Sequence, residues 1–180
     1  MEQPFFSIPK VLFDNNNELI IKASTTSSKD DFDFFQGKFV LKNKKRKEIF
    51  NNCNEWITFD STQEMYKILH GLGNIDNFLA IRDGKPFEGM TVRLFNPETK
   101  LWSMYWADSN RGKFDPPVVG SFKNNIGYFF TKDIINGKNV LVVFRWDKTD
   151  ENNPKWGQAF SNDQGKTWEW NWFMDMTKTG

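Results

Sequence analysis

The feature that most constrains the fold is the regular succession of turn sequences along the chain. From about residue 34 onward, short runs rich in aromatic and β-branched residues are separated by turns at intervals of roughly 8 to 12 residues, as in all-β domains. The turns read "NPETK", "DSNRGK", "KNNIG", "INGKN", "DENNPK" and "SNDQGK". No long stretch of the sequence carries apolar residues at helical spacing. The sequence therefore predicts an all-β fold, an antiparallel up-and-down β-barrel of about 8–10 strands, because closure of a meander removes its exposed edges.

Composition supports one compact domain and argues against several classes of partner. A chain of 180 residues that is 38% hydrophobic can fill a single core. Its 24 basic and 23 acidic residues nearly balance, so no overall charge draws it to nucleic acid or to a membrane surface. We expect a single barrel domain over residues 31–180. An N-terminal arm and linker over residues 1–30 precedes it and contains the small, polar stretch "ASTTSS".

The cysteine, the histidine and the N-terminal sequence bear on location and cofactors. Cys53 is the single cysteine, which is typical of a protein from a reducing compartment. The N-terminal sequence lacks the basic start and apolar run of a signal peptide, and no segment has the length of a membrane span. With one His and one Cys, a metal site is not expected. We therefore predict a cytoplasmic protein that carries no metal and no other cofactor.

Turn positions also predict the register of the hairpins, and hence which side chains share a face. Around "NPET", the expected register pairs Leu94 with Trp102. This register gives one wholly apolar face and places Arg93 and Tyr105 on the other, mixed face.

The dipeptide "NG" at positions 136–137 predicts a second hairpin with a type I′ turn. Its expected register pairs Phe129 with Phe144 on one face. On the other face it pairs Tyr128 with Arg145. This hairpin repeats the pattern of the first, with one apolar face and one mixed face.

The most aromatic stretch is "SNDQGKTWEWNWFMDM", residues 161–176, with three tryptophans at alternate positions. Because side chains alternate between the two faces of a strand, this spacing places the three rings on one face. We expect a hairpin in which Ser161 pairs with Thr167. The aromatic face of this hairpin would carry Trp156, Gln158, Phe160, Trp168, Trp170 and Trp172. Glu169 and Asn171 take the other face.

Which hairpin face lines the barrel decides the function, and three arrangements are open. In the first, the aromatic faces point inward, since burial of apolar surface contributes about 25 cal/mol per Å² to folding. In the second, the polar faces line a cavity, and the N-terminal arm or a second subunit covers the aromatic faces. In the third, aromatic rings and a few buried charges share the interior.

Two arginines within apolar strand sequences are candidate ligand contacts. Arg93 lies in "MTVRLF" and Arg145 in "LVVFRW", and a guanidinium there can bind a carboxylate or phosphate through two hydrogen bonds. The alternative is an arginine at the surface, whose stem covers apolar groups, or one paired with Glu169. The full candidate ligand-binding set is Arg93, Arg145, Tyr105, Tyr128, Glu169, Asn171, His70, Asn74, Trp106 and Gln158.

Three hypotheses for function follow. The leading one is a barrel that binds a small apolar or amphipathic molecule, with an acidic group held by Arg93 or Arg145. The second is an enzyme, a hydrolase or isomerase, that uses His70 or Glu169 as a base and an arginine to stabilise negative charge. The third is a filled barrel that acts as an interaction module, for example in a homodimer. The sequence leaves the choice between binding and catalysis open.

The run "KNKKRKE", residues 42–48, is the one concentrated basic segment of the sequence. Nucleic-acid surfaces usually spread such charge over a face and interleave it with stacking aromatic residues. Here the run lies between apolar segments, which favours a solvated strand or hairpin tip. We therefore expect no nucleic-acid partner.

Two resemblances bear on the fold. "SNDQGKTW" resembles the Asp-box of sialidases, a Ser-x-Asp-x-Gly-x-Thr-Trp hairpin turn. A single copy indicates turn architecture, in which Asp163 binds backbone amides, Gly165 takes a positive φ and Trp168 packs beneath the turn. The segments "FDFFQGKF", "HGLGNID", "FEGMTVRLFNPETKLWSMYWAD", "FDPPVVGSF" and "WGQAFSNDQGKTWEWNW" together resemble an uncharacterised bacterial family of calycin type. This resemblance covers about residues 31–176 and implies a lipocalin-like barrel whose interior holds a small, largely apolar molecule.

Overall fold

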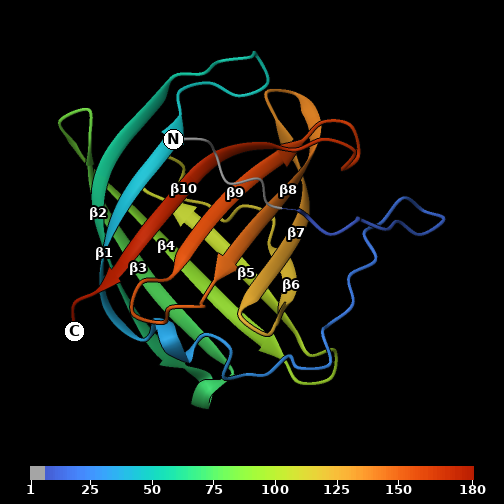
Figure 1. The fold of residues 1–180 in the computed structure, drawn as a ribbon, viewed down its shortest axis with the longest axis horizontal. Helices are drawn as coiled ribbons and strands as arrows, with labels where there is room; N and C mark the ends of the chain where they lie inside the picture. The colour runs from blue at the N-terminus through green and yellow to red at the C-terminus, as the bar shows by residue number, and fades with distance from the viewer. Residues whose placement is uncertain (1–6) are drawn as a thin grey trace.

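The computed structural model describes residues 7–180 and shows a closed antiparallel β-barrel (Figure 1). The described residues form ten strands, each hydrogen-bonded to the strands before and after it, and β1 also pairs with β10 to close the barrel. The strands are β1 (Gly37–Arg46), β2 (Trp56–Ile68), β3 (Gly73–Arg82), β4 (Lys85–Asn96), β5 (Leu101–Asp108), β6 (Val118–Lys123), β7 (Ile126–Ile135), β8 (Lys138–Asp147), β9 (Lys155–Ser161) and β10 (Glu169–Lys178). The predicted up-and-down barrel is confirmed.

Helical structure within residues 7–180 consists of two short 3₁₀ helices, η1 (Asp33–Phe35) and η2 (Leu69–Gly71). No helix in this part of the chain is long and apolar enough to cross a membrane. Both 3₁₀ helices lie at the same end of the barrel, η1 just before β1 and η2 between β2 and β3.

The "NG" hairpin has the expected register. Strands β7 and β8 pair Phe129 with Phe144 and Tyr128 with Arg145. Asn136 and Gly137 have positive φ values of 51° and 73°, as a type I′ turn requires. Local turn chemistry was therefore sufficient to fix this hairpin.

The "NPET" hairpin differs from the expected register by one residue. Strands β4 and β5 pair Arg93 with Met104 and Phe95 with Trp102. The loop is one residue longer than in the expected register, and its last residue, Lys100, adopts a left-handed conformation with a φ of 56°. A one-residue slip exchanges the two faces of a strand. The expected apolar face was therefore wrong, and Arg93 shares the inner face with Trp102 and Met104.

The tryptophan hairpin also departs from the prediction. Phe160 lies opposite Glu169, and a β-bulge then shifts the register between Trp170 and Trp172. An extra residue in one strand inverts the alternation of its side chains. Consequently Trp172 points into the barrel, whereas Trp170 stacks on Phe173 at 5.6 Å on the outside. The predicted single stripe of three tryptophans was wrong.

The turn of this hairpin has the predicted Asp-box structure. Asp163 accepts hydrogen bonds from the Thr167 amide at 2.9 Å and the Thr167 hydroxyl at 2.6 Å. Gly165 has a positive φ of 83°, and a Cβ atom at Gly165 would lie 3.4 Å from the Trp168 ring. The three predicted roles in this turn are confirmed.

Aromatic side chains from the segment before β1 close one end of the barrel, which we call the floor. Phe32, Phe34 and Phe35 are buried there, and the Phe32 ring packs edge-on against Trp102 at 5.0 Å. The Lys148 ammonium donates a hydrogen bond to the Asp31 carbonyl at 2.9 Å and ties the segment to the end of β8. The opposite end, which we call the mouth, is bounded by residues 47–55, 83–84, 109–117, 136–137 and 162–168.

The described part of the N-terminal arm, residues 7–30, runs along the outside of β6 and β7 (Figure 1). Ser24 donates its amide to the Ser121 hydroxyl at 2.8 Å. The Tyr128 hydroxyl donates to the Ser7 carbonyl at 3.1 Å. This part of the arm thus packs on its own barrel, and residues 1–6 of the expected arm lie outside the described residues.

Candidate ligand-binding cavity

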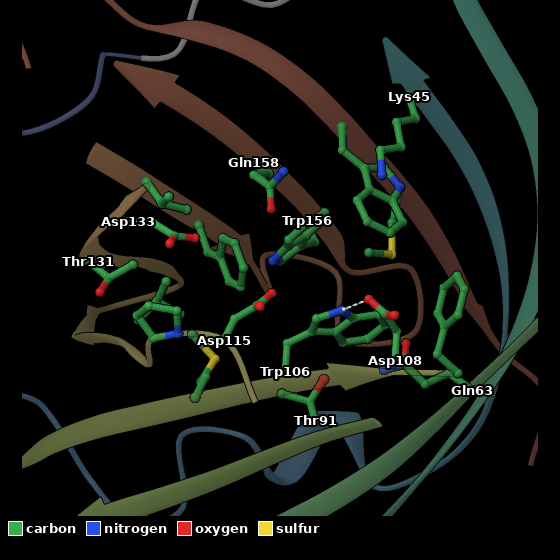
Figure 2. Close-up of a pocket in the computed structure, with 18 of the residues that line it drawn as sticks. Lys45, Gln63, Thr91, Trp106, Asp108, Asp115, Thr131, Asp133, Trp156 and Gln158 are labelled. Atoms are coloured by element: carbon green, nitrogen blue, oxygen red, sulfur yellow. Dashed lines mark hydrogen bonds between the residues drawn. The ribbon is translucent and has the colours of Figure 1, made fainter. Parts of the chain in front are cut away.

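Between the floor and the mouth the barrel encloses a cavity of about 350 Å³. Its wall is built from the inward-facing positions of the strands, and Figure 2 shows the side chains that converge on it. The apolar part of this wall includes Phe78, Met104, Trp106, Phe144, Trp156 and Trp172. Charged and polar side chains share the interior with these rings. The structure therefore has the third of the three arrangements open from the sequence.

A buried ion pair lies near the floor. Arg93 is 2% exposed and Asp76 is 1% exposed, and the Arg93 guanidinium donates a hydrogen bond to the Asp76 carboxylate. The same nitrogen donates to the Asn74 side-chain oxygen at 3.0 Å, and Gln63 donates its amide to the other Asp76 oxygen. Because an unpaired buried charge is strongly destabilising, the pair explains how a charge is accommodated in an aromatic core.

Aromatic rings complete the surroundings of Arg93. Its guanidinium carbon lies about 5 Å from three ring centroids, which belong to Phe32, Phe35 and Trp146. A guanidinium is weakly hydrated and stacks favourably on such rings. Arg93 therefore connects the floor to the cavity wall.

Three polar atoms on buried side chains of the cavity wall lack a hydrogen-bond partner within residues 7–180. They are Gln63 Oε1, Arg93 Nε and Trp146 Nε1. A buried polar atom without a partner costs about 1–3 kcal/mol. A water molecule or a polar group of a ligand inside the cavity would reduce this cost.

The mouth carries two basic side chains that lie over aromatic rings. The Lys45 ammonium lies 4.2 Å from the centroid of the Trp172 ring. The Arg82 guanidinium lies 4.9 Å from the Phe87 ring and 5.3 Å from the Phe59 ring. Within the described part of the chain, neither cation forms an ion pair. Both side chains line the cavity.

A third basic residue at the mouth, Arg111, is fully engaged by carboxylates. It binds Asp108 at 2.9 Å and Asp115 at 2.6 Å. The pKa of Lys45 is lowered to about 8, mainly by burial and also by the charges of Arg82 and Arg111, against the opposing effect of Asp108. The positive charge at Lys45 is therefore not compensated by its surroundings.

The position of Trp106 at the cavity wall depends on a glycine. A Cβ atom at Gly89 would lie 2.1 Å from the far edge of the Trp106 indole. The indole therefore lies directly over the Gly89 backbone, and its Nε1 donates to Asp108 at 3.4 Å (Figure 2). Only a residue without a side chain fits beneath this ring.

The structure brings together four of the ten sequence-predicted site residues at the cavity or its polar floor. Arg93, Trp106 and Gln158 line the cavity, and Asn74 binds Arg93 at the floor. Asn171, in the β10 bulge, is 1% exposed and accepts a hydrogen bond from Gln158 at 2.8 Å. It therefore fixes the position of Gln158 on the cavity wall.

Three other predicted residues point away from the interior. Arg145 binds Asp147 at 3.0 Å on the outer face of the barrel, and Tyr128 points toward the N-terminal arm. Tyr105 packs against the Phe114 ring. Each lies between two inward-facing residues of its strand, so the strict alternation of strand side chains places it outside.

His70 and Glu169, the two candidate bases, do not line the cavity. His70 is exposed in η2 at the floor end, with a φ of 52°. Glu169 lies at the mouth end of β10 and accepts a hydrogen bond from the Phe50 amide at 3.0 Å. Neither side chain is placed to act on a molecule inside the barrel.

Sequence reasoning missed Lys45, Gln63 and Arg82, three polar side chains that line the cavity. It also missed Asp76, the buried partner of Arg93. The run that contains Lys45 forms the end of β1, where Lys42 and Lys44 are exposed as expected. Lys45 instead continues the inward-facing series Phe39, Leu41 and Asn43. A period of two counted from Phe39 would have placed Lys45 inside.

The fold and the cavity define the class of this molecule, a closed antiparallel β-barrel with an internal, partly polar cavity. No family model matches the chain, and no curated protein matches it. Residues 7–180 contain no group of three His, Cys, Asp or Glu side chains placed to hold a metal ion. The function of this barrel is therefore inferred from the geometry of its cavity.

Proposed function

We propose that this barrel binds a small amphipathic molecule inside its cavity, in the manner of a lipocalin-like protein of calycin type. The observation that carries the proposal is the cavity itself, whose volume of about 350 Å³ falls within the range of small-molecule sites, about 300–1,000 Å³. Its wall combines aromatic rings with a few polar groups, as ligand sites generally do.

The unpartnered polar atoms near the floor support the same function. Gln63 Oε1 is an acceptor, whereas Arg93 Nε and Trp146 Nε1 are donors. A filled barrel that acts only through its outer surface has no use for such atoms on a cavity wall. A bound molecule that carries a carbonyl or hydroxyl group would satisfy them.

A binding function is favoured over catalysis because the candidate bases lie elsewhere. His70 and Glu169 are outside the cavity, and Arg93 is already paired with Asp76. The cytoplasmic location and the homodimer stay predictions from the sequence.

A fluorescence titration with phenylnaphthylamine, an uncharged apolar probe, tests the proposed function. Thr91 and Thr131 line the cavity, so Thr91→Phe and Thr131→Phe each fill part of it. We expect the probe to bind the wild-type protein and to lose affinity by about tenfold or more in both variants, equivalent to at least about 1.4 kcal/mol.

The matched control is Thr62→Phe, which makes the same change on the exposed outer face of β2. It should leave the affinity unchanged. Near-ultraviolet circular dichroism establishes that each variant keeps its tertiary structure. Absence of probe binding to the wild-type protein, or equal binding to all four proteins, contradicts the proposal.

Native mass spectrometry of freshly purified protein complements the titration. A mass above that of the denatured chain, followed by organic extraction, would identify the class of a retained molecule.

A further inference from the structure

The two cations at the mouth lie on the same side of the cavity. Lys45 is the last inward-facing residue of β1 and Arg82 the last of β3, and β2 lies between these strands. The positive charge of Arg82 contributes to the lowered pKa of Lys45, because like charges repel. An anion placed between them would relieve this repulsion.

The carboxylates of the mouth do not supply that anion. Asp108 and Asp115 both bind Arg111, and Asp108 also accepts a hydrogen bond from Trp106. Asp133 lines the cavity from β7, and Figure 2 shows it on the opposite side of the cavity from Lys45. Its carboxylate accepts a hydrogen bond from the Ile134 amide at 2.7 Å. The mouth is therefore polarised, with uncompensated positive charge on the β1–β3 side.

Aromatic contacts hold both cations in position without using their hydrogen-bonding capacity. Lys45 lies over Trp172, and Arg82 lies over Phe59 and Phe87. Contacts with a ring face leave the N–H groups of an ammonium and of a guanidinium available to an acceptor. The cations are thus held in place before any anion binds.

We infer that Lys45 and Arg82 bind the acidic group, a carboxylate or sulfonate, of an amphipathic ligand whose apolar body lies against Trp106, Trp156 and Trp172. This inference rests on the proposed function and adds the charge and the orientation of the ligand. The acidic group lies at the mouth and the apolar body extends toward the floor. Arg93 takes no part in binding the acid, because Asp76 neutralises it.

The test compares two probes that share an aromatic body. Anilinonaphthalene sulfonate carries an acidic group, whereas phenylnaphthylamine does not. We expect wild-type protein to bind the sulfonate more tightly than the uncharged probe. Lys45→Met and Arg82→Met should each weaken sulfonate binding by about tenfold, the effect of losing one charge-assisted hydrogen bond. Each should affect binding of the uncharged probe much less, because Met keeps most of the apolar stem of the replaced side chain.

Two further variants serve as controls. Lys44→Met removes the neighbouring lysine of β1, which is exposed and lies over Trp56 at 5.0 Å, and should change neither affinity. Lys45→Arg keeps the positive charge and should retain most of the preference for the sulfonate. It also provides a folded variant if Lys45→Met loses its structure.

The outcomes separate this inference from the proposed function. If neither probe binds in the cavity, the proposed function fails. If both probes bind with equal affinity, or if Lys45→Met and Arg82→Met weaken both probes alike, the acid-binding site is refuted while the cavity function stands. If Lys44→Met weakens sulfonate binding as much as Lys45→Met does, the effect is one of net charge and the inference is refuted.

Discussion

The two ends of the cavity treat positive charge in opposite ways. Near the floor, Arg93 is almost fully buried, lies against aromatic rings and is paired with Asp76. At the mouth, Lys45 and Arg82 also lie against aromatic rings but have no ion-pair partner among residues 7–180. Similar side chains in similar aromatic surroundings therefore differ in whether the protein itself neutralises them.

The different depths of the two sites explain why Arg93 is paired with a carboxylate and the two mouth cations are not. A charge deep in a core has to be neutralised within the fold, because desolvation without a partner costs several kcal/mol. A charge at an opening retains some water and can remain without a partner at a smaller cost. Near the floor the charge of Arg93 is neutralised by Asp76 within the fold, whereas at the mouth the charges of Lys45 and Arg82 have no carboxylate partner among residues 7–180, which is where we propose that an anion binds.

The largest expected effect is on stability at the floor. Arg93→Met leaves the Asp76 carboxylate buried without its partner and should lower the free energy of unfolding by about 3–5 kcal/mol. Arg82→Met at the mouth should lower it by less than about 1 kcal/mol. Urea denaturation followed by tryptophan fluorescence measures both. Equal losses in the two variants would break the contrast between the two ends.

Adding Asp76→Asn to Arg93→Met sharpens this result. The second substitution removes the uncompensated negative charge and keeps an acceptor for Gln63. The double variant should recover more than half of the stability lost in Arg93→Met. No recovery would show that Arg93 acts by packing rather than by charge.

The next effect concerns the wall between the two ends. Gly89→Ala places a methyl group against the Trp106 indole and should lower the free energy of unfolding by about 1–3 kcal/mol. Combining it with Trp106→Phe, whose shorter side chain lacks the clashing ring, should cost less than the sum of the single variants. A double-mutant cycle by urea denaturation checks this coupling, and simple additivity would count against the close contact.

The pH dependence of stability tests the uncompensated charge of Lys45. Because the pKa of Lys45 falls from 10.5 to about 8 on folding, the unfolded chain binds more protons between these values, and stability should rise with pH in this window. The slope from a single group is at most about 1.4 kcal/mol per pH unit. Urea denaturation at several pH values should show this rise in the wild-type protein and a smaller one in Lys45→Met.

The same titration should appear in binding. Affinity for anilinonaphthalene sulfonate should fall as the pH rises through about 8 and Lys45 loses its charge. The affinity of Lys45→Met should be flat over this range. A parallel decline in both proteins would assign the titration to another group.

The smallest effect is expected for Asp163, a half-buried carboxylate in the turn at the mouth end. Hydrogen bonds from Thr167 lower the pKa of Asp163 to about 2. A lowered carboxyl pKa contributes stability above the unfolded value of 3.8 that is lost as the pH falls toward 2. Asp163→Ala should lower the free energy of unfolding at neutral pH by about 1 kcal/mol or less, as measured by urea denaturation. A loss comparable to that of Arg93→Met would contradict the expectation that a charged residue contributes more to stability the more deeply it is buried.

Local sequence signals were reliable where a feature depends on a few adjacent residues. The "NG" turn fixed the register of β7 and β8, and the Asp-box predicted the contacts of Asp163 and the positive φ of Gly165. A turn depends on only three or four adjacent residues, so it can be recognised from the sequence. The barrel itself follows from the repetition of such turns.

The candidate site was less predictable, because it depends on register. A single additional loop residue at Lys100 placed Arg93 on the face of Trp102 and Met104 instead of the face of Tyr105, and the bulge in β10 turned Trp170 outward. Neither irregularity has a strong local signature. The pairing of Asp76 with Arg93 was equally hard to predict, because the two residues lie diagonally on the neighbouring strands β3 and β4 and meet only in the observed register.

The sequence by itself determined that this protein is an antiparallel barrel of short strands, and it located most of the turns. Alternation with a period of two divides each strand into two faces, but it does not say which face is inner. Closure of the ten strands decided that, because it fixed all registers at once. Only the tertiary structure placed Arg93 beside Asp76 and left Lys45 and Arg82 at the mouth without a carboxylate partner in the described chain.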